Sequence, residues 1–201
     1  MLLSLDDAAW DAPSMCSEWR VRDVAGHLIW RLGTTRWSMI ASGAGAYFGK
    51  HISPSHAIAE IGREIGSRPV PELAQELRAI ADNKVRARQR VSIIELTEAI
   101  VHAYDMSEAI GADIRLSPRS TAAVVLNRLR VPGHGRTLAR SYTLSAVDAR
   151  WQLGSGPRIE ASAGELTMHV FDRRRLELVP VSTTEQRIVR PGETSESACE
   201  H

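Results

Sequence analysis

Apolar residues recur every three or four positions through the first half of the chain, the spacing that places them on one face of a helix. In the first such segment, residues 21–40, they are Val21, Val24, Ala25, Leu28 and Leu32. Three later segments repeat the pattern, at residues 55–65, 71–83 and 91–110. Gly111 follows the last of these, and glycine commonly ends a helix. The pattern therefore predicts a bundle of about four helices over residues 1–112.

The pattern changes in the second half of the chain. Another helix is expected at residues 118–129. Residues 140–164 then alternate between apolar and polar around a Gly-Ser-Gly-Pro turn, which predicts two antiparallel strands. A short helix and a final strand are expected at residues 164–174 and 176–181. The predicted fold class is therefore mainly α: the helical bundle is followed by a small α+β domain at residues 113–187 and a disordered polar tail at 188–201.

Composition narrows the class of partner. The formal net charge of +1 gives no electrostatic reason to expect nucleic acid or a membrane surface as a partner. No apolar run reaches the roughly 18 residues that span a bilayer. The start of the chain lacks the basic region of a signal peptide, so we expect a cytoplasmic protein. The two cysteines, Cys16 and Cys199, are too few for a disulfide framework, and Cys16 is expected to be a buried, small apolar residue.

The segment 91–110 carries a narrow polar stripe. At 100° per residue, the stripe covers roughly 80°. Its members are Glu95, Glu98, His102 and Asp105. Apolar residues border it on both sides, whereas a solvent-facing stripe is usually broad. Glu98 and His102 are four residues apart and point to the same place, where a divalent cation would satisfy both side chains. The same spacing also fits an ordinary ion pair on a wetted helix face.

His27, in the predicted helix 21–40, offers a third ligand from a second helix. A site with three ligands keeps a position open for water or substrate, which is typical of catalytic rather than structural metal sites. His27 also fits a hydrogen-bonded histidine in the core, with Asp23 one turn earlier. The residues alone leave both interpretations open.

Two motifs resemble those of a known family. The segments WDAPSMCSEWRVRDVAGHLIW and IIELTEAIVHAYDMSEAIG resemble the two motifs of the mycothiol-dependent maleylpyruvate isomerase family, a branch of the DinB-like four-helix bundles. The resemblance implies that His27, Glu98 and His102 bind a divalent metal ion. The segment ARWQLGSGPRIEASAGELTMHVFDRR is similar to the family's small C-terminal domain, and implies that Arg173 is its catalytic arginine. Mycothiol, a low-molecular-weight thiol, is the implied cosubstrate.

The resemblance implies a chemistry for this site. Three nitrogen and oxygen ligands suit Zn²⁺ best and also admit Ni²⁺ or Mn²⁺. A thiol bound to such an ion loses its proton near neutral pH, and the resulting metal-bound thiolate is the nucleophile. We expect it to attack a small electrophile, which leads to isomerisation or to S-transfer. Arg173 is expected to clamp a substrate carboxylate, and Asp105 to orient His102.

Two positions depart from the family pattern. Arg20 stands where a serine or threonine would cap the helix, and Asp172 stands where a glycine precedes the arginine. These departures keep an alternative open, a non-catalytic metal-binding or stress-response protein of the same fold. A third interpretation, a DNA-binding module that uses the basic run at residues 84–90, is disfavoured by the near-neutral charge. The sequence does not define the substrate or the native metal, and it leaves a homodimer open.

Overall fold

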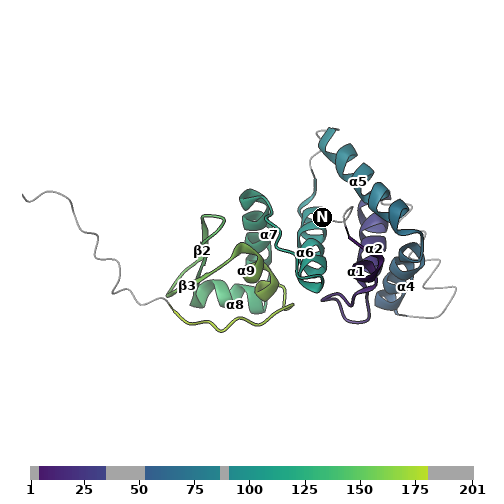
Figure 1. Cartoon of the computed structure of the whole chain (residues 1–201). Helices are drawn as coiled ribbons and strands as arrows, with labels where there is room; N and C mark the ends of the chain where they lie inside the picture. The colour runs from purple at the N-terminus through teal and green to yellow at the C-terminus, as the bar shows by residue number, and fades with distance from the viewer. Residues whose placement is uncertain (1–4, 35–52, 87–90, 181–201) are drawn as a thin grey trace, which may run out of the picture.

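The computed structural model describes residues 5–34, 53–86 and 91–180. Its first part comprises α1 (Asp7–Asp11), α2 (Val21–Gly33), α4 (Pro54–Gly66), α5 (Val70–Arg86) and α6 (Ile93–Ala109). The second part comprises α7 (Pro118–Arg130), α8 (His134–Ser141), β1 (Thr143–Ala146), β2 (Trp151–Gly154), β3 (Arg158–Ala161) and α9 (Ala163–Val170). In Figure 1, α6 lies between these two groups of elements. The mainly α fold class, with a helical bundle followed by a small α+β unit, is confirmed.

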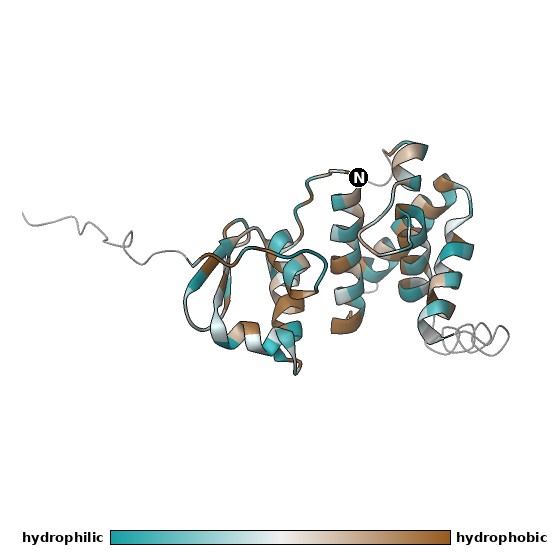
Figure 2. Ribbon diagram, turned by 90° about the horizontal axis from the view of Figure 1, so that it is seen from below, coloured by the Kyte–Doolittle hydropathy of each residue, from teal (hydrophilic) through white to brown (hydrophobic). Residues whose placement is uncertain are grey.

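Helix α2 lies at the centre of the bundle, because it packs against α4, α5 and α6. Most of its residues from Val21 to Trp30 are buried, which is typical of a helix surrounded by other helices. Its apolar side chains share a core with Trp10, Leu73 and Met106 from neighbouring elements. Apolar and polar positions are mixed around the outer helices (Figure 2), so those helices bury one face each.

Glycines bring α2 and α4 into backbone contact. A Cβ atom added at Gly26 would collide with the carbonyl oxygen of Gly62 and would lie 2.6 Å from the backbone nitrogen of Gly66. Gly62 in turn lies under His27, since a Cβ there would come within 3.4 Å of the Cβ of His27. The close approach of these two helices therefore sets the position of His27.

The ends of α2 and α6 test the predicted boundaries. The expected helix 21–40 is wrong at its end, because α2 stops at Gly33. Thr34 is extended, with φ −97° and ψ 155°. Residues 35–40 lie outside the described residues. The predicted stop at Gly111 is confirmed. Gly111 has φ +63°, and its N–H donates to the carbonyl of Glu108 (3.2 Å), while the next N–H, of Ala112, reaches back to Ser107 (2.9 Å). These two bonds form a Schellman motif.

The sheet differs from the predicted pair of antiparallel strands. Its order is β2-β1-β3, with β1 antiparallel to β2 and parallel to β3. The Gly-Ser-Gly-Pro segment does not fold β2 onto β3, because its two glycines pack against the backbone before β1: Gly154 against Tyr142, and Gly156 against Ser141. Both glycines have positive φ, 104° and 111°. Helix α8 was not predicted. The predicted final strand is wrong for residues 176–180, which form no strand; residue 181 lies outside the described residues.

Apolar side chains link the two parts of the chain. Ile100 and Tyr104 of α6 share a cluster with Val124 of α7 and Met168 of α9. The sheet has its own core, where the Trp151 indole donates to Thr121 Oγ1 (3.1 Å). The cluster of Ile100, Tyr104, Val124 and Met168 contains residues from both sides of position 112. The division into domains at 1–112 and 113–187 stays a prediction. The predicted disordered tail lies outside the described residues.

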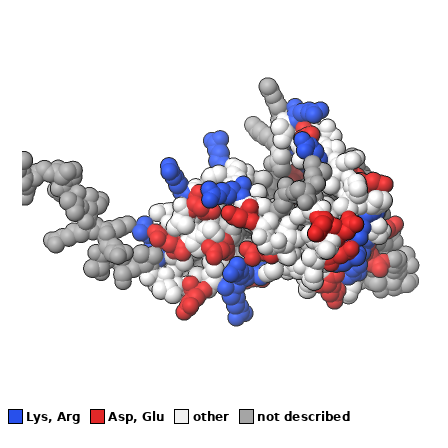
Figure 3. All heavy atoms as spheres, viewed as in Figure 1, with Lys and Arg blue, Asp and Glu red and all other residues white. Residues whose placement is uncertain are grey.

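Charges of both signs share the surface of the described residues. Lysine and arginine side chains are interspersed with aspartate and glutamate on the face shown in Figure 3. Within the predicted basic run, Lys84 pairs with Glu95 (2.8 Å) and Arg86 lies near Asp82 (3.9 Å); residues 87–90 lie outside the described residues. Among the described helices, none is long and apolar enough to cross a membrane.

The glycine contact predicts a specific loss of stability. Replacing Gly26 by alanine (Gly26→Ala) should lower the free energy of unfolding by about 1–3 kcal/mol, because its methyl group would meet rigid backbone of α4. Urea unfolding of both proteins measures the difference. The matched control is Gly33→Ala on the same helix, where the added methyl meets only the flexible end of Ile80. Equal losses in the two variants would contradict the proposed contact.

The ion pair at the start of α6 predicts a pH-dependent stability. The hydrogen bond from Lys84 outweighs burial and, with help from Ser92, lowers the pKa of Glu95 from 4.5 to about 2. The stabilisation is therefore complete above about pH 4.5 and lost as the pH falls toward 2. Glu95→Gln, which keeps the capping box of Ser92, should cost up to about 1 kcal/mol at pH 7 and nothing near pH 2. Unfolding midpoints between pH 2 and 7 measure the effect.

A second capping box supplies the control for that experiment. In α9, Glu165 caps Ser162 in the same way, with hydrogen bonds of 3.0 and 2.8 Å, and no lysine pairs with it among the described residues. Glu165→Gln should therefore show a smaller pH-dependent difference than Glu95→Gln. If the two variants behave alike, Lys84 contributes no stabilisation.

Candidate metal centre

Three side chains from two helices meet at one point. His27 lies in the middle of α2, while Glu98 and His102 lie one turn apart on α6. Glu98 Oε2 is 3.2 Å from His27 Nε2 and 3.3 Å from His102 Nε2, and the three atoms all lie within 4.8 Å of one another. Ligand bonds of about 2.0–2.2 Å require donors about 3–4 Å apart, so the arrangement suits one cation.

The electrostatics of this group follow from burial and mutual hydrogen bonds. Burial would raise the pKa of Glu98, but the hydrogen bonds with His102 and His27 outweigh it and hold this pKa below its ordinary value. Burial lowers the pKa of His27, although the hydrogen bond with Glu98 acts against it. The site therefore contains a charged carboxylate and an imidazole that favours its neutral form, as metal ligands require.

Asp105 lies behind His102 and fixes its ring. Asp105 Oδ2 is 2.9 Å from His102 Nδ1, and the carboxylate is fully buried. In the neutral ring, a proton on Nδ1 would leave Nε2 free to bind a cation, which is the arrangement that orients histidine ligands in metal sites. Burial would lower the pKa of His102, but the hydrogen bonds with Asp105, Cys16 and Glu98 raise it to about 11. The Nδ1 atom of His27 has no such partner among the described residues.

The three donors open onto a cleft of about 480 Å³. Its lining also includes Cys16, Trp19, His56 and Arg173. The rings of Trp19 and Trp30 lie 5.0 and 6.0 Å from the ring of His27, so apolar faces screen one ligand from water. Arg31 Nε lies 3.5 Å from the second oxygen of Glu98. The site is thus buried at its base and open on one side.

Comparison with known proteins places the chain in a family. Residues 2–130 match the family model of the mycothiol maleylpyruvate isomerase N-terminal domain. The chain belongs to this family. None of the curated proteins compared with it matches. The crystal structure of a mutant of the mycothiol-dependent maleylpyruvate isomerase has 11% sequence identity and a TM-score of 0.50, with 86% of this chain and 82% of that chain covered. At that identity the likeness shows the fold alone. The structure of the isomerase without the mutation gives 13% identity and a TM-score of 0.49 over the same shares of both chains.

Arg173 enters the cleft from the second part of this family member. It follows α9, where the Asp172 N–H donates to the carbonyl of His169 (3.1 Å) and the Arg173 N–H donates to that of Met168 (2.8 Å). These are the bonds of a Schellman motif, as at Gly111, with Asp172 at the left-handed position (φ +58°). Arg173 Nε then lies 3.3 Å from Asp105 Oδ1. The departure from glycine at residue 172 therefore leaves the backbone shape intact.

The other departure, Arg20, is compensated locally. The arginine side chain has no acceptor and cannot cap α2. Instead the carboxylate of Asp23 accepts hydrogen bonds from the Arg20 backbone N–H and from its guanidinium, each 3.0 Å long. A carboxylate near the start of a helix is also favourable for the helix dipole. The helix that carries His27 thus keeps a stabilised start.

The structure gathers all five predicted site residues in one region. His27, Glu98, His102 and Arg173 line the cleft, and Asp105 lies directly behind it. Glu95, the fourth member of the polar stripe, does not reach the cleft, because it pairs with Lys84 and Ser92. The sequence interpretation did not assign Cys16, Trp19 or Arg31 to the site. Cys16 and Trp19 reach the site from the loop before α2, which no helical spacing indicates, whereas Arg31 lies four residues after His27 and could have been found by that spacing.

The left-handed position of Asp172 predicts a stabilising substitution. Asp172→Gly should raise the free energy of unfolding by up to about 1 kcal/mol, because glycine adopts positive φ without steric cost. The reciprocal variant, Gly111→Asp at the end of α6, should lower it by a similar amount, since nothing lies within 4 Å of an added Cβ atom there. Thermal or urea unfolding measures both. Changes of the same sign would show that backbone strain does not decide the stability at these ends.

Proposed function

We propose that the protein is a divalent-metal-dependent enzyme that uses mycothiol as a nucleophile on a small electrophilic substrate, for isomerisation or S-transfer. The convergence of His27, Glu98 and His102 on one point at the base of an open cleft carries the proposal. Membership of the family supports the choice of thiol. The cleft volume falls within the range of about 300–1,000 Å³ typical of small-molecule sites.

The donor set suits a catalytic metal ion. Two imidazole nitrogens and one carboxylate oxygen are typical of Zn²⁺, and they also admit Ni²⁺ or Mn²⁺. When bound, such an ion lowers the pKa of a thiol, so that the thiolate nucleophile forms near neutral pH. The chain contributes the negative charge of Glu98 and the ring orientation of His102, which Asp105 maintains.

Arg173 is the residue that would recognise the substrate. Its side chain is about one-third exposed (34%) and lines the cleft, while its Nε faces the buried Asp105. The contact with Asp105 holds the guanidinium in place, and its remaining N–H groups can bind a carboxylate. The substrate class that fits is therefore a small anionic molecule with an electrophilic carbon.

The two reaction classes differ in the fate of the sulfur. In isomerisation, the thiolate sulfur adds to one carbon of a double bond, the resulting single bond rotates, and elimination returns the thiol unchanged. In S-transfer, the carbon–sulfur bond remains and a leaving group departs with the electron pair. The presence of Arg173 in the same cleft as the three donors serves both, because each reaction starts with attack on a bound anion.

The function is tested first by metal content and thiol binding. Purified protein should contain about one divalent ion per chain by elemental analysis, and calorimetry should detect mycothiol binding only when the ion is present. Glu98→Gln should lose both the ion and thiol conjugation to a generic electrophile, with a fall of at least about 100-fold in rate. Glu95→Gln, one turn away on α6 and outside the cleft, is the matched control. An unchanged rate of thiol conjugation in Glu98→Gln would contradict the proposal.

Substrate recognition is tested with a second pair of variants. Arg173→Lys should raise KM for an electrophile that bears a carboxylate by about tenfold, and should leave KM for an uncharged one unchanged. Arg174→Lys is the control, because Arg174 pairs with Glu108 and is not among the residues lining the cleft. Metal and mycothiol binding without turnover of any electrophile would favour the alternative, a non-catalytic metal-binding or stress-response protein.

A further inference from the structure

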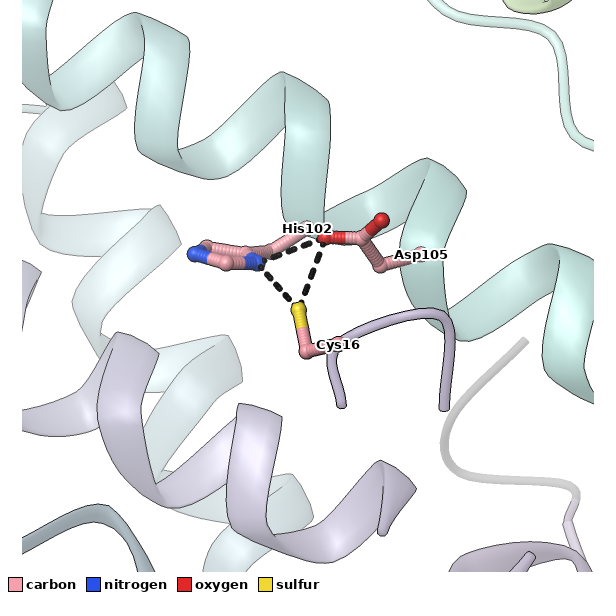
Figure 4. Close-up of side chains that lie close together, drawn as sticks. All are labelled: Cys16, His102 and Asp105. Atoms are coloured by element: carbon pink, nitrogen blue, oxygen red, sulfur yellow. Dashed lines mark hydrogen bonds and ion pairs between the residues drawn. The ribbon is translucent and has the colours of Figure 1, made fainter. Parts of the chain in front are cut away.

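Two more potential ligands, Cys16 and Asp105, meet at the opposite edge of the His102 ring. Figure 4 shows Cys16, His102 and Asp105 in a triangle. Cys16 Sγ lies 3.1 Å from Asp105 Oδ2 and 3.6 Å from His102 Nδ1, and the last two atoms are 2.9 Å apart. We propose that these three residues form a second site for a divalent thiophilic cation, such as Cd²⁺ or Zn²⁺.

The distances suit one ion. Bonds of about 2.3 Å to sulfur and about 2.0–2.2 Å to nitrogen and oxygen place neighbouring ligand atoms about 3–3.6 Å apart. The three measured distances lie in or near this interval, so binding requires only small side-chain movements. Cys16 is 9% exposed, His102 7% and Asp105 not at all, so water competes little for these donors.

The loop that carries Cys16 is held in place. The Cys16 N–H donates to Ser14 Oγ (3.1 Å), and the Cys16 carbonyl accepts from the Trp19 N–H (3.1 Å). A bridge between Pro13 and Arg20 closes the loop before α2. The other two donors come from α6, a regular helix. Donors on supported elements need little ordering when an ion binds.

The charges of the cluster balance a divalent ion. When the ion binds, the Cys16 thiol proton leaves to solvent, His102 Nδ1 loses its proton, and the ring's proton lies on Nε2. One thiolate and one carboxylate then neutralise the two positive charges. Asp105 Oδ1 is buried without a hydrogen bond among the described residues, and Arg173 Nε lies 3.3 Å from it.

The second site would exclude the first one. A proton on His102 Nε2 points at Glu98, 3.3 Å away, and this nitrogen can then no longer bind an ion together with His27. A thiophilic cation at Cys16 would therefore displace the ion of the proposed function. That displacement rests on the proposed function, whereas the binding of a cation at Cys16 does not. Thiolate selects soft ions, so Cd²⁺ should prefer the second site and Mn²⁺ the first.

Cadmium titration tests the second site directly. The full-length Cys199→Ser protein leaves Cys16 as the one thiol in the sequence. Adding Cd²⁺ should produce the ultraviolet absorption of a cadmium–thiolate bond, which saturates at one ion per chain. Cys16→Ser in this background should abolish the absorption, and Asp105→Asn should weaken Cd²⁺ binding by at least about tenfold. Glu98→Gln, which leaves all three donors of the second site in place, should retain the absorption.

Each outcome decides the proposal. The proposal is wrong if the Cys199→Ser parent shows no absorption. It is also wrong if Asp105→Asn binds Cd²⁺ with equal affinity, because the thiol would then bind the ion without Asp105. Should Cys16→Ser fail to fold by circular dichroism, protection of Cys16 from alkylation by Cd²⁺ in the parent supplies the same answer. Two Cd²⁺ ions per chain would overturn the exclusion. The proposed function fails separately, when Mn²⁺ and Ni²⁺ do not bind but the cadmium–thiolate absorption persists.

Discussion

A charged, half-buried carboxylate between two imidazoles is the interaction on which the site depends. Glu98 reaches His27 and His102 with the same oxygen, at 3.2 and 3.3 Å. Even partial burial of a carboxylate is costly unless it is paired, so this contact favours the observed position of α6 against α2. The glycine contact between α2 and α4 fixes α2 from its other side. Together these two contacts bring donors from separate helices to one point. A divalent cation would compensate the negative charge of Glu98 more strongly than two imidazole protons.

Local patterns accounted for the helices and for half of the site. Helical spacing predicted the bundle, and the four-residue separation predicted that Glu98 and His102 share a face. Whether His27 joined them was left open by the residues alone, because it depends on how two helices pack. The resemblance to the family motifs supplied that link. Cys16 and Arg173 reach the site through contacts between distant segments, for which the sequence holds no periodic signal.

The failures of prediction have equally specific causes. Apolar spacing continued past Gly33, but Thr34 turns the chain into an extended conformation and closes a hydrogen bond back to Trp30 (2.5 Å). Alternation around the Gly-Ser-Gly-Pro segment predicts two antiparallel strands, yet Gly154 and Gly156 pack against backbone outside the two strands that they separate. In both cases a contact in three dimensions overrides a pattern that is valid along the chain.

The Asp172 departure shows that backbone shape, more than residue identity, positions Arg173. An aspartate at φ +58° gives the same two hydrogen bonds that glycine gives at the end of α6. Arg173 consequently meets Asp105, which also accepts from Cys16 and holds His102. One buried carboxylate thus connects the C-terminal part of the chain, the loop before α2 and the imidazole that faces Glu98. A change in what Asp105 binds therefore acts on His102 Nδ1 and, through this ring, on the contact with Glu98.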